Sequence, residues 1–128
     1  MILFLDTCDS EKTSIYLVDD KFLAAHIWPS QKTQQEKLHT EIAKFLKKSK
    51  IKLSDLDKVG VVVGPGHFSR VRTGVVTANT LAYALDIPVV GVRKTEELDF
   101  KSILKLKGQK SVEVYYDREP NITQPKKK

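Results

Sequence analysis

The stretch VVVGPGHFSRVRTG, residues 61–74, indicates the fold class, because a run of valines ends at a glycine-proline-glycine turn. The run begins at Val59, and an uninterrupted apolar segment is typical of a strand covered on both faces. Small and apolar residues at helical spacing then follow from Val71 to Leu85. The stretch therefore predicts a strand, a tight turn and a helix, which together form a unit of an α/β fold.

The composition predicts one soluble, globular domain. The chain has 128 residues, of which 41% are hydrophobic and 30% charged, and its formal net charge is +6. Cys8 is the only cysteine, which excludes an intrachain disulfide and a multi-cysteine metal site. No segment resembles a signal peptide or is apolar enough for a membrane helix. We therefore expect a cytoplasmic protein that does not contact a membrane.

Hydrophobic periodicity predicts the element order β-β-β-α-β-α-β-α. Three apolar runs separated by short polar turns predict an antiparallel meander, and they span residues 2–7, 14–20 and 21–28. The later elements expected are helices at 34–50, 71–85 and 94–106, and parallel strands at 59–63 and 87–92. Thr95 is the expected cap of the third helix. A strand-like piece is expected at 111–116, so residues 1–116 form one lobe and residues 117–128 a polar, basic tail.

The glycine turn also raises the question of a phosphate-binding loop. A Walker loop is excluded, because Arg70 to Arg72 stand where Gly-Lys-Ser/Thr is required. Gly64, Gly66 and Ser69 match a G-x-G-x-x-S dinucleotide pattern, and Arg93 follows the next strand, where a 2′-phosphate would lie. The bulky residues after the second glycine oppose a close approach of the backbone to pyrophosphate. This pattern therefore indicates dinucleotide binding only weakly.

A third phosphate site is suggested by the first strand, which ends in Asp6 and is followed by a hairpin, as in actin-like ATPases and sugar kinases. The hairpin TCDSEKT contains no glycine and adds Asp9 and Glu11. Negative charge at this position opposes the binding of phosphate. We therefore interpret the turn at Gly64, Pro65 and Gly66 as structural.

Several stretches together resemble the TsaB family, also called YeaZ. They are the N-terminal ILFLDTCDSEKTSIYLVDD, the LSDLD connection and the glycine turn with its helix. The turn keeps five residues of the family's G-P-G-S-F-T-G-L-R motif, namely Gly64, Pro65, Gly66, Phe68 and Arg72. The likeness covers roughly residues 1–99.

This resemblance implies a lobe of the actin/Hsp70/sugar-kinase (ASKHA, ribonuclease H-like) type, with a mixed five-stranded sheet and helices on its faces. It implies a non-catalytic role in making threonylcarbamoyladenosine in tRNA, without a cofactor of its own. The implied partners are TsaD, which binds the metal and transfers threonylcarbamoyl, and the ATPase TsaE; tRNA would be reached through the complex. The chain departs from the family at His67, Ser69 and Arg70. Against this family we expect it to be a short form without most of the second lobe.

Pairing with TsaD, and homodimerisation, use the first two helices in this family. Small residues let a second helix approach closely. The residues expected at the partner interface are Leu38, Ile42, Val76, Thr77, Thr80, Tyr83 and Ala84.

Two alternative functions stay open. One is a nucleotide-binding enzyme fragment, although the sequence contains no nucleophile–base constellation. The other is a protein that binds tRNA directly through the lysine-rich C-terminal end, Lys126 to Lys128. A metal site is not expected, because His26, His39 and His67 share no ligand spacing.

Overall fold

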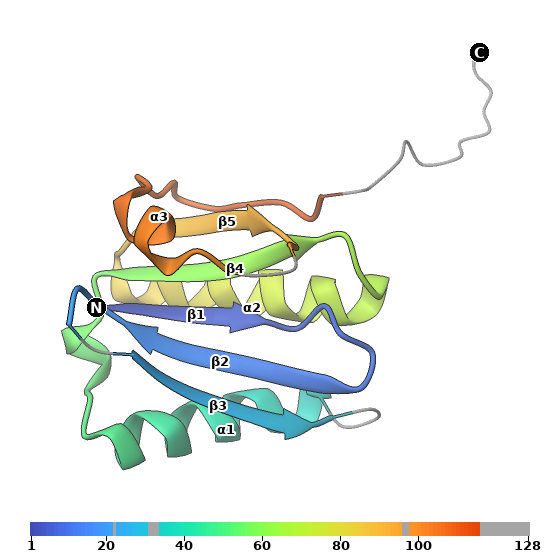
Figure 1. Cartoon of the computed structure of the whole chain (residues 1–128), viewed down its shortest axis with the longest axis horizontal. Coiled ribbons are helices and arrows are strands. Elements are labelled where there is room, and N and C mark those ends of the chain that lie inside the picture. The colour runs from blue at the N-terminus through green and yellow to red at the C-terminus, as the bar shows by residue number, and fades with distance from the viewer. Residues whose placement is uncertain (22, 31–33, 96–97, 116–128) are drawn as a thin grey trace.

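The computed structural model describes residues 1–21, 23–30, 34–95 and 98–115, and it contains one mixed sheet. The strands lie in the order β3-β2-β1-β4-β5 (Figure 1). Their bounds are β1 Ile2–Asp6, β2 Lys12–Val18, β3 Leu23–Pro29, β4 Lys58–Gly64 and β5 Val89–Arg93. The helices are α1 Gln34–Ser49, α2 Phe68–Leu85 and α3 Phe100–Lys105, with a short 3-10 turn at Leu53–Asp55.

The pairing of the strands confirms the predicted topology. β1, β2 and β3 form the antiparallel meander, while β4 lies parallel to both β1 and β5. Every residue of β1 is buried, and so are Val59 to Gly64 of β4. A central strand is covered on both faces, which is why these two segments are continuous apolar runs in the sequence.

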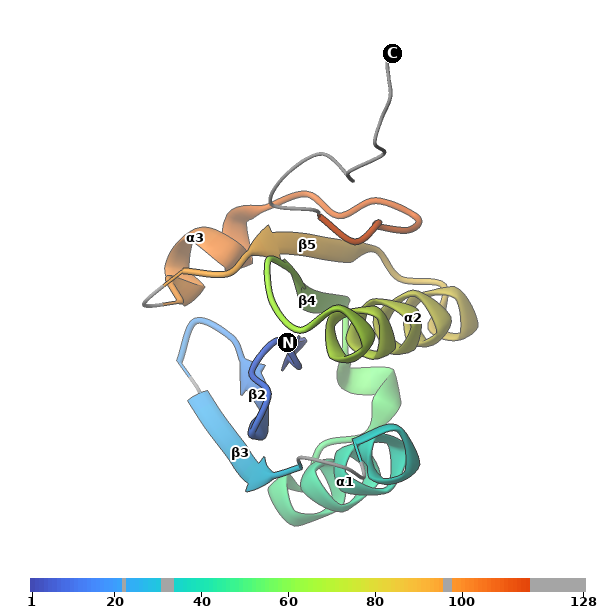
Figure 2. The same ribbon diagram turned by 90° about the vertical axis from the view of Figure 1, so that its right-hand side faces the viewer.

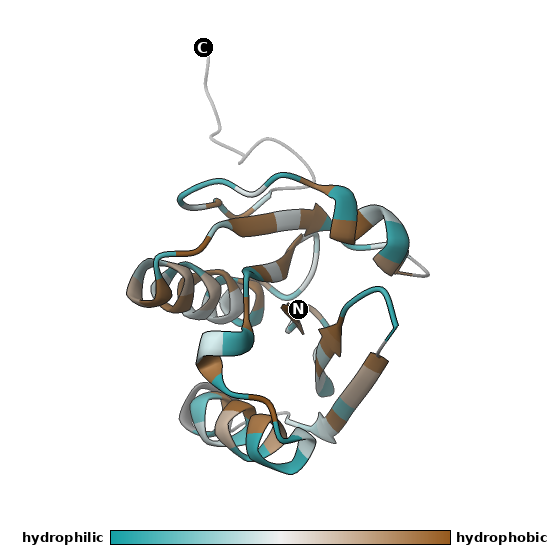
Figure 3. Cartoon of the chain, turned by 90° about the vertical axis from the view of Figure 1, so that its left-hand side faces the viewer, coloured by the Kyte–Doolittle hydropathy of each residue, from teal (hydrophilic) through white to brown (hydrophobic). Residues whose placement is uncertain are grey.

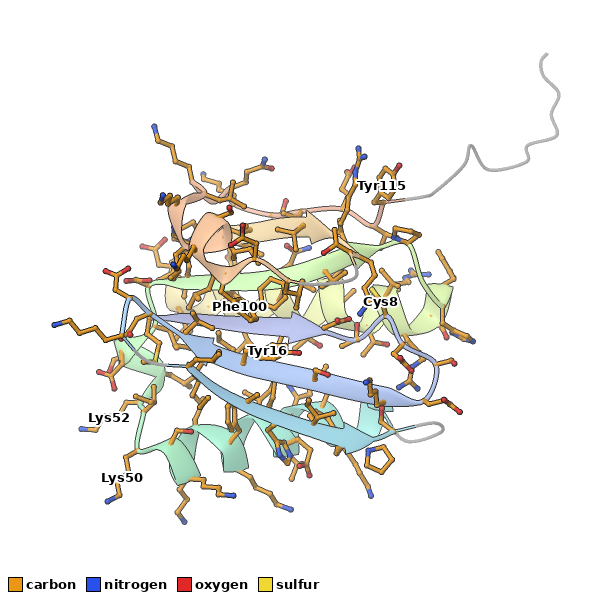
Figure 4. All side chains as sticks on the ribbon, in the orientation of Figure 1. Cys8, Tyr16, Lys50, Lys52, Phe100 and Tyr115 are labelled. Carbon is orange, nitrogen blue, oxygen red and sulfur yellow. The ribbon has the colours of Figure 1, made fainter. Side chains whose placement is uncertain are left out.

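The helices lie on opposite faces of the sheet. α1 and α2 lie side by side on one face, and the short α3 lies on the other (Figure 2). Under α3, the ring of Phe100 packs edge-on against Phe4, with 5.6 Å between centroids, and lies 5.0 Å from the ring of Tyr16. Figure 4 shows Phe100 and Tyr16 together in front of the sheet. The core therefore has two layers, one on each face.

The third helix is shorter than predicted and has a different cap. α3 begins at Phe100, and the Asp99 carboxylate accepts hydrogen bonds from the backbone N–H and the hydroxyl of Ser102, at 3.2 and 2.8 Å. Thr95, the expected cap, lies before this helix. An aspartate at the N-cap satisfies the free amides of the first turn, so Asp99 fixes where α3 begins.

The prediction of a strand at residues 111–116 was wrong for the described part, residues 111–115. The Asn79 side chain of α2 donates a hydrogen bond to the carbonyl of Val112 and accepts one from its backbone N–H, each at 2.9 Å. The backbone of Val112 is therefore not available for pairing with a neighbouring strand. Tyr115 N–H donates to the Val63 carbonyl at 2.8 Å, and Val89 forms a single bridge with Gln109. The segment is held as an irregular strap beside β5. Residues 116–128, which include the predicted tail, lie outside the described residues.

Within the described ranges, no helix has both the length and the apolar composition needed to cross a membrane.

Candidate functional site

The glycine turn joins β4 to α2 and packs against the loop between β1 and β2. Gly64 has a φ of +120°, and a Cβ there would lie 2.7 Å from the carbonyl oxygen of Tyr115. A Cβ on Gly66 would lie 2.7 Å from the Cβ of Cys8. Pro65 follows Gly64 through a cis peptide bond. These close approaches give a structural reason for each glycine that involves no phosphate.

The guanidinium of Arg70 joins the start of α2 to three other segments. Arg70 is only 6% exposed, and its Nε donates to the Asp9 carbonyl at 2.7 Å. Its two terminal nitrogens donate to the carbonyl and hydroxyl of Ser30, at 2.6 and 2.5 Å, and to the hydroxyl of Thr13 at 3.4 Å. Burial lowers the pKa of Arg70, and attraction to Asp9 partly opposes this. We call this set of hydrogen bonds from the Arg70 guanidinium the Arg70 clamp. It connects the β1–β2 loop, β2 and the residue after β3 to α2.

Sequence reasoning used Arg70 to exclude a Walker loop and as a departure from the family motif, and these hydrogen bonds of its side chain were missed. Its partners lie about 40 to 61 positions away in the chain, so no local spacing reveals them. The backbone adds to the clamp, because the Thr7 hydroxyl donates to the Arg70 carbonyl at 2.7 Å. Gly74, one turn further along α2, is in contact with the same threonine, where a Cβ would collide.

The carboxylate of Asp6 lies at the end of β1, where an actin-like enzyme would use it, but it is already paired. Lys94 Nζ donates to Asp6 Oδ2 at 2.6 Å, and Cys8 N–H donates to Asp6 Oδ1 at 3.2 Å. Although burial lowers the pKa of Lys94, its hydrogen bond and attraction to Asp6 raise it overall. Burial, followed by the charge of Asp6, raises the pKa of the Cys8 thiol to about 12. Cys8 is therefore protonated at neutral pH and is not an activated nucleophile.

The backbone amides around this site have internal partners. The N–H of Glu11 donates to Asp9 Oδ1 at 2.7 Å, and the N–H of His67 donates to the Cys8 carbonyl at 3.2 Å. Arg93, considered for a 2′-phosphate, stacks on the ring of Tyr115 at 4.2 Å. Among the described residues, no group of three or more His, Cys, Asp or Glu side chains could hold a metal ion. This geometry favours neither phosphate interpretation.

Three residues predicted at the partner interface are in the core instead. Leu38 and Ile42 of α1 are 1% and 4% exposed, and Thr77 of α2 is 5% exposed. Leu38 and Ile42 belong to the one apolar stripe of α1, which is buried, whereas α2 has apolar or small residues on two sides and Thr77 lies on the buried one. They therefore contribute mainly to the packing of α1 and α2, and of the three only Thr77 lines the groove between these helices.

The other four predicted residues lie on the surface of α2. Val76 is 55% and Tyr83 88% exposed, and Thr80 and Ala84 are exposed as well. In Figure 3, α2 is coloured mostly white to brown, whereas α1 alternates more strongly with teal. Exposed apolar and aromatic side chains on one helix, here Val76 and Tyr83, are typical of a surface that another protein covers.

Phe68 and Arg72, predicted as parts of the structural turn, belong to this outer face of α2. α2 begins at Phe68, which is 51% exposed, and Arg72 is exposed one turn later. Phe68, Arg72, Val76 and Thr80 are spaced four apart, so they follow one side of the helix. A groove of about 430 Å³ lies along this side, and His39 of α1 lines its other wall. We call the set of Phe68, Arg72, Val76, Thr80, Tyr83 and Ala84 the α2 outer face.

Comparisons with known proteins lead to one group of relatives. The family model of TsaD, tRNA N6-adenosine threonylcarbamoyltransferase, matches residues 27–111. The chain is 33% identical over 97 residues to the tRNA threonylcarbamoyladenosine biosynthesis protein TsaB of Bacillus subtilis (strain 168), covering 76% of this chain and 42% of that protein. It is 36% identical over 61 residues to the tRNA N6-adenosine threonylcarbamoyltransferase of Geotalea uraniireducens (strain Rf4), covering 48% and 18%.

A solved structure shares the fold. YeaZ from Pseudomonas aeruginosa superposes with a TM-score of 0.68 at 28% identity, covering 72% of this chain and 43% of that one. This match confirms the predicted α/β fold class, with a mixed five-stranded sheet of the ASKHA, ribonuclease H-like type. The chain spans less than half the length of these relatives, 42% in the case of TsaB.

Proposed function

Because the chain belongs to the TsaD family and is a TsaB/YeaZ-like member of it, we propose that it is a non-catalytic subunit in the formation of threonylcarbamoyladenosine in tRNA. Its task is to bind and support a TsaD-type transferase subunit. The observation that carries this proposal is the exposed, largely apolar α2 outer face beside a strand end closed by internal contacts.

The closed strand end supports a non-catalytic role. The Asp6 carboxylate is neutralised by Lys94, and the Arg70 clamp occupies the space between the glycine turn and the β1–β2 loop. A nucleotide would have to displace a partly buried ion pair and several charge-assisted hydrogen bonds, which are among the stronger polar contacts in proteins. The alternative of a nucleotide-binding enzyme fragment is disfavoured for this reason.

The α2 outer face supports helix-to-helix contact with the partner. Phe68, Val76 and Tyr83 supply apolar and aromatic area, which dominates the energy of protein interfaces. Thr80 and Ala84 are small, so a partner helix can pack closely between them. The same face would serve a homodimer of this chain, which would compete with the transferase subunit.

The remaining partners follow from the same role. A TsaE-type ATPase would join the complex, and tRNA would be contacted mainly through the transferase subunit. All of this takes place in the cytoplasm. Direct tRNA binding by the C-terminal lysines is the second alternative; those lysines, Lys126 to Lys128, lie outside the described residues.

The test is to mix the chain with the TsaD-type subunit of its own organism and measure mass by size exclusion with light scattering. A complex is expected, and Val76→Arg should abolish it, because the substitution places a charge in the middle of the α2 outer face. Leu53→Arg is the matched control: Leu53 is 44% exposed but lies in the 3-10 turn before β4.

The absence of a complex at micromolar concentration, with ATP and the TsaE-type protein present, would contradict the proposal. Equal loss of binding in the Leu53→Arg and Val76→Arg variants would contradict the assigned surface. Thermal unfolding of each variant separates a lost interface from a lost fold.

A further inference from the structure

The edge strand β3 has few of the features that prevent an exposed strand from pairing with other chains. Within the described ranges β3 pairs only with β2, so its outer backbone groups have no neighbouring strand. Soluble proteins usually protect such an edge with lysines, bulges or inward-pointing charges, because a bare edge pairs with other chains. β3 reads LAAHIWP, with no Lys, Arg, Asp or Glu, and its proline is the last residue. Leu23 and Ile27 are 60% and 53% exposed on the face opposite α1.

A groove of about 420 Å³ runs along this edge between β3 and α1. Ala25 and the ring of His26 line its strand side, and Phe45 lies at the base of its helix side. The ring of His26 is stacked against that of Phe45, with 5.9 Å between centroids, so packed aromatic rings form the bottom of the groove. Ala24, which also lines the groove and shares the strand face of His26, has a small side chain that leaves room for the side chains of an added strand.

The helix wall of the groove is basic. Lys44 and Lys48 lie one turn apart on α1 and both line the groove. The one acidic residue among the lining residues, Glu41, is only 17% exposed, and its Oε1 lies 2.7 Å from His26 Nε2, within hydrogen-bond distance. Its other oxygen lies 3.9 Å from Nζ of Lys44, whose side chain is still 71% exposed, and Lys48 adds a second positive charge. Lys50 and Lys52 project from the chain just after α1, as Figure 4 shows, and extend the positive charge beyond this end of the groove.

We propose that the β3 edge binds an extended, acidic segment of a partner protein, which adds a sixth strand to the sheet. In this mode the main-chain hydrogen bonds supply affinity, and alternate side chains supply specificity. Apolar side chains of the added strand would cover Leu23 and Ile27, and acidic ones would meet Lys44 and Lys48. A second copy of this chain fits less well, because antiparallel pairing through β3 would bring its own α1 lysines toward the same groove.

The test uses the full chain, labelled with nitrogen-15, and the acetylated, fluorescein-labelled peptide VEVEVEV. Fluorescence anisotropy should show saturable binding of this peptide and none of VKVKVKV. Backbone NMR shifts should cluster at residues 23–29, and the β3 amides should exchange more slowly when the peptide is bound. The double variant Lys44→Glu/Lys48→Glu should bind about ten-fold more weakly, as expected for two charge reversals at a partly exposed interface.

The matched control is Lys101→Glu/Lys105→Glu, which has the same helical spacing and the same change of net charge on α3, across the sheet. It should bind within about two-fold of the unchanged chain. The proposal is independent of the α2 outer face, since Val76→Arg should leave peptide binding unchanged.

Three outcomes would overturn the proposal: VEVEVEV shows no binding at about 1 mM, VKVKVKV binds as tightly as VEVEVEV, or the peptide shifts the NMR signals of α2 and not those of β3. Light scattering that shows a dimer joined through β3 would assign the edge to a second copy. Stronger shifts at the same amides with single-stranded oligodeoxythymidine would assign the groove to nucleic acid.

Discussion

Two consecutive parts of the chain place polar and apolar side chains in opposite ways. Between Gly64 and Gly74, the turn and the first residues of α2 bury the guanidinium of Arg70 among hydrogen-bond partners. Between Val76 and Ala84, the same helix exposes Val76 and Tyr83. The end of β1, where a nucleotide-binding protein would hold its phosphates, is closed by the Asp6–Lys94 ion pair and the Arg70 hydrogen bonds. The adjacent helix has exposed apolar surface. This difference favours a protein that functions by binding a partner protein. Each prediction below tests either the closed strand end and its contacts or the exposed helix surface.

The largest effect is expected from Arg70→Met. The variant loses the hydrogen bonds to Ser30 and Asp9 and leaves buried carbonyl groups without partners, so the free energy of unfolding should fall by about 3 kcal/mol or more. Urea unfolding followed by circular dichroism measures this. Arg72→Met is the matched control, because Arg72 is exposed one turn away, and its loss should stay within about 0.5 kcal/mol. Equal losses would mean that the clamp contributes nothing.

A smaller effect, about 1–2 kcal/mol at neutral pH, is expected from Lys94→Met, which leaves the buried Asp6 carboxylate without its cation. Lys94 has a pKa raised above its usual value of 10.5, so its stabilising contribution is fully present below that pH and is lost as the pH rises beyond it. The difference between the two proteins should therefore shrink above pH 10.5.

Unfolding free energies of both proteins across this pH range provide the measurement. Lys101→Met, on exposed α3, controls for the loss of one positive charge. A difference that is independent of pH would show that Lys94 acts by packing and not by its charge.

An effect of about 1 kcal/mol is expected from Asn79→Ala. The variant loses both hydrogen bonds to the backbone of Val112; each contributes about 0.5 kcal/mol, the low end of the usual range, because the groups are only partly buried and water can replace the amide. Residues 111–115 should then separate from β5, and the amides of Val112 and Tyr115 should exchange faster with deuterium. Thr80→Ala, one residue along on the exposed side, should leave both amides unchanged. Unaltered exchange in Asn79→Ala would show that the strap is held by its other contacts.

The sheet could be predicted from the sequence because its central strands carry a strong local signal. The valine run of β4 and the apolar β1 are buried on both faces, and their sequences are apolar throughout for that reason. The strap at 111–115 has an equally strand-like sequence. A single side chain from α2, Asn79, decides against a strand there, and such a tertiary contact leaves no local pattern.

The candidate site was only partly predictable for the same physical reason. Periodicity identifies the apolar residues of a helix, but when two faces are apolar or small it does not say which one meets the sheet. For this reason Thr77 was predicted on the outer side of α2 although it is buried, whereas Tyr83 is exposed. Leu38 was predicted at the interface although it belongs to the one apolar stripe of α1, which is buried. Phe68 was assigned to the turn because the predicted start of α2 came three residues too late.

The smallest effect on stability is expected from Tyr83→Ser. Tyr83 is 88% exposed, so its removal from the free chain takes almost no apolar area out of the core, and the free energy of unfolding should change by less than about 0.5 kcal/mol. Affinity for the transferase subunit should nevertheless fall at least about ten-fold, because tyrosines are common binding hot spots. Isothermal titration calorimetry with the purified subunit measures this, and Leu106→Ser, at 41% exposure on the strap side of α3, is the control. A stable variant with unchanged affinity would show that the exposed side of α2 around Tyr83 does not contact the transferase subunit. This apolar surface would then bind another partner. A stable variant that no longer binds would show that one helix contributes to the fold through its buried side and to assembly through the α2 outer face.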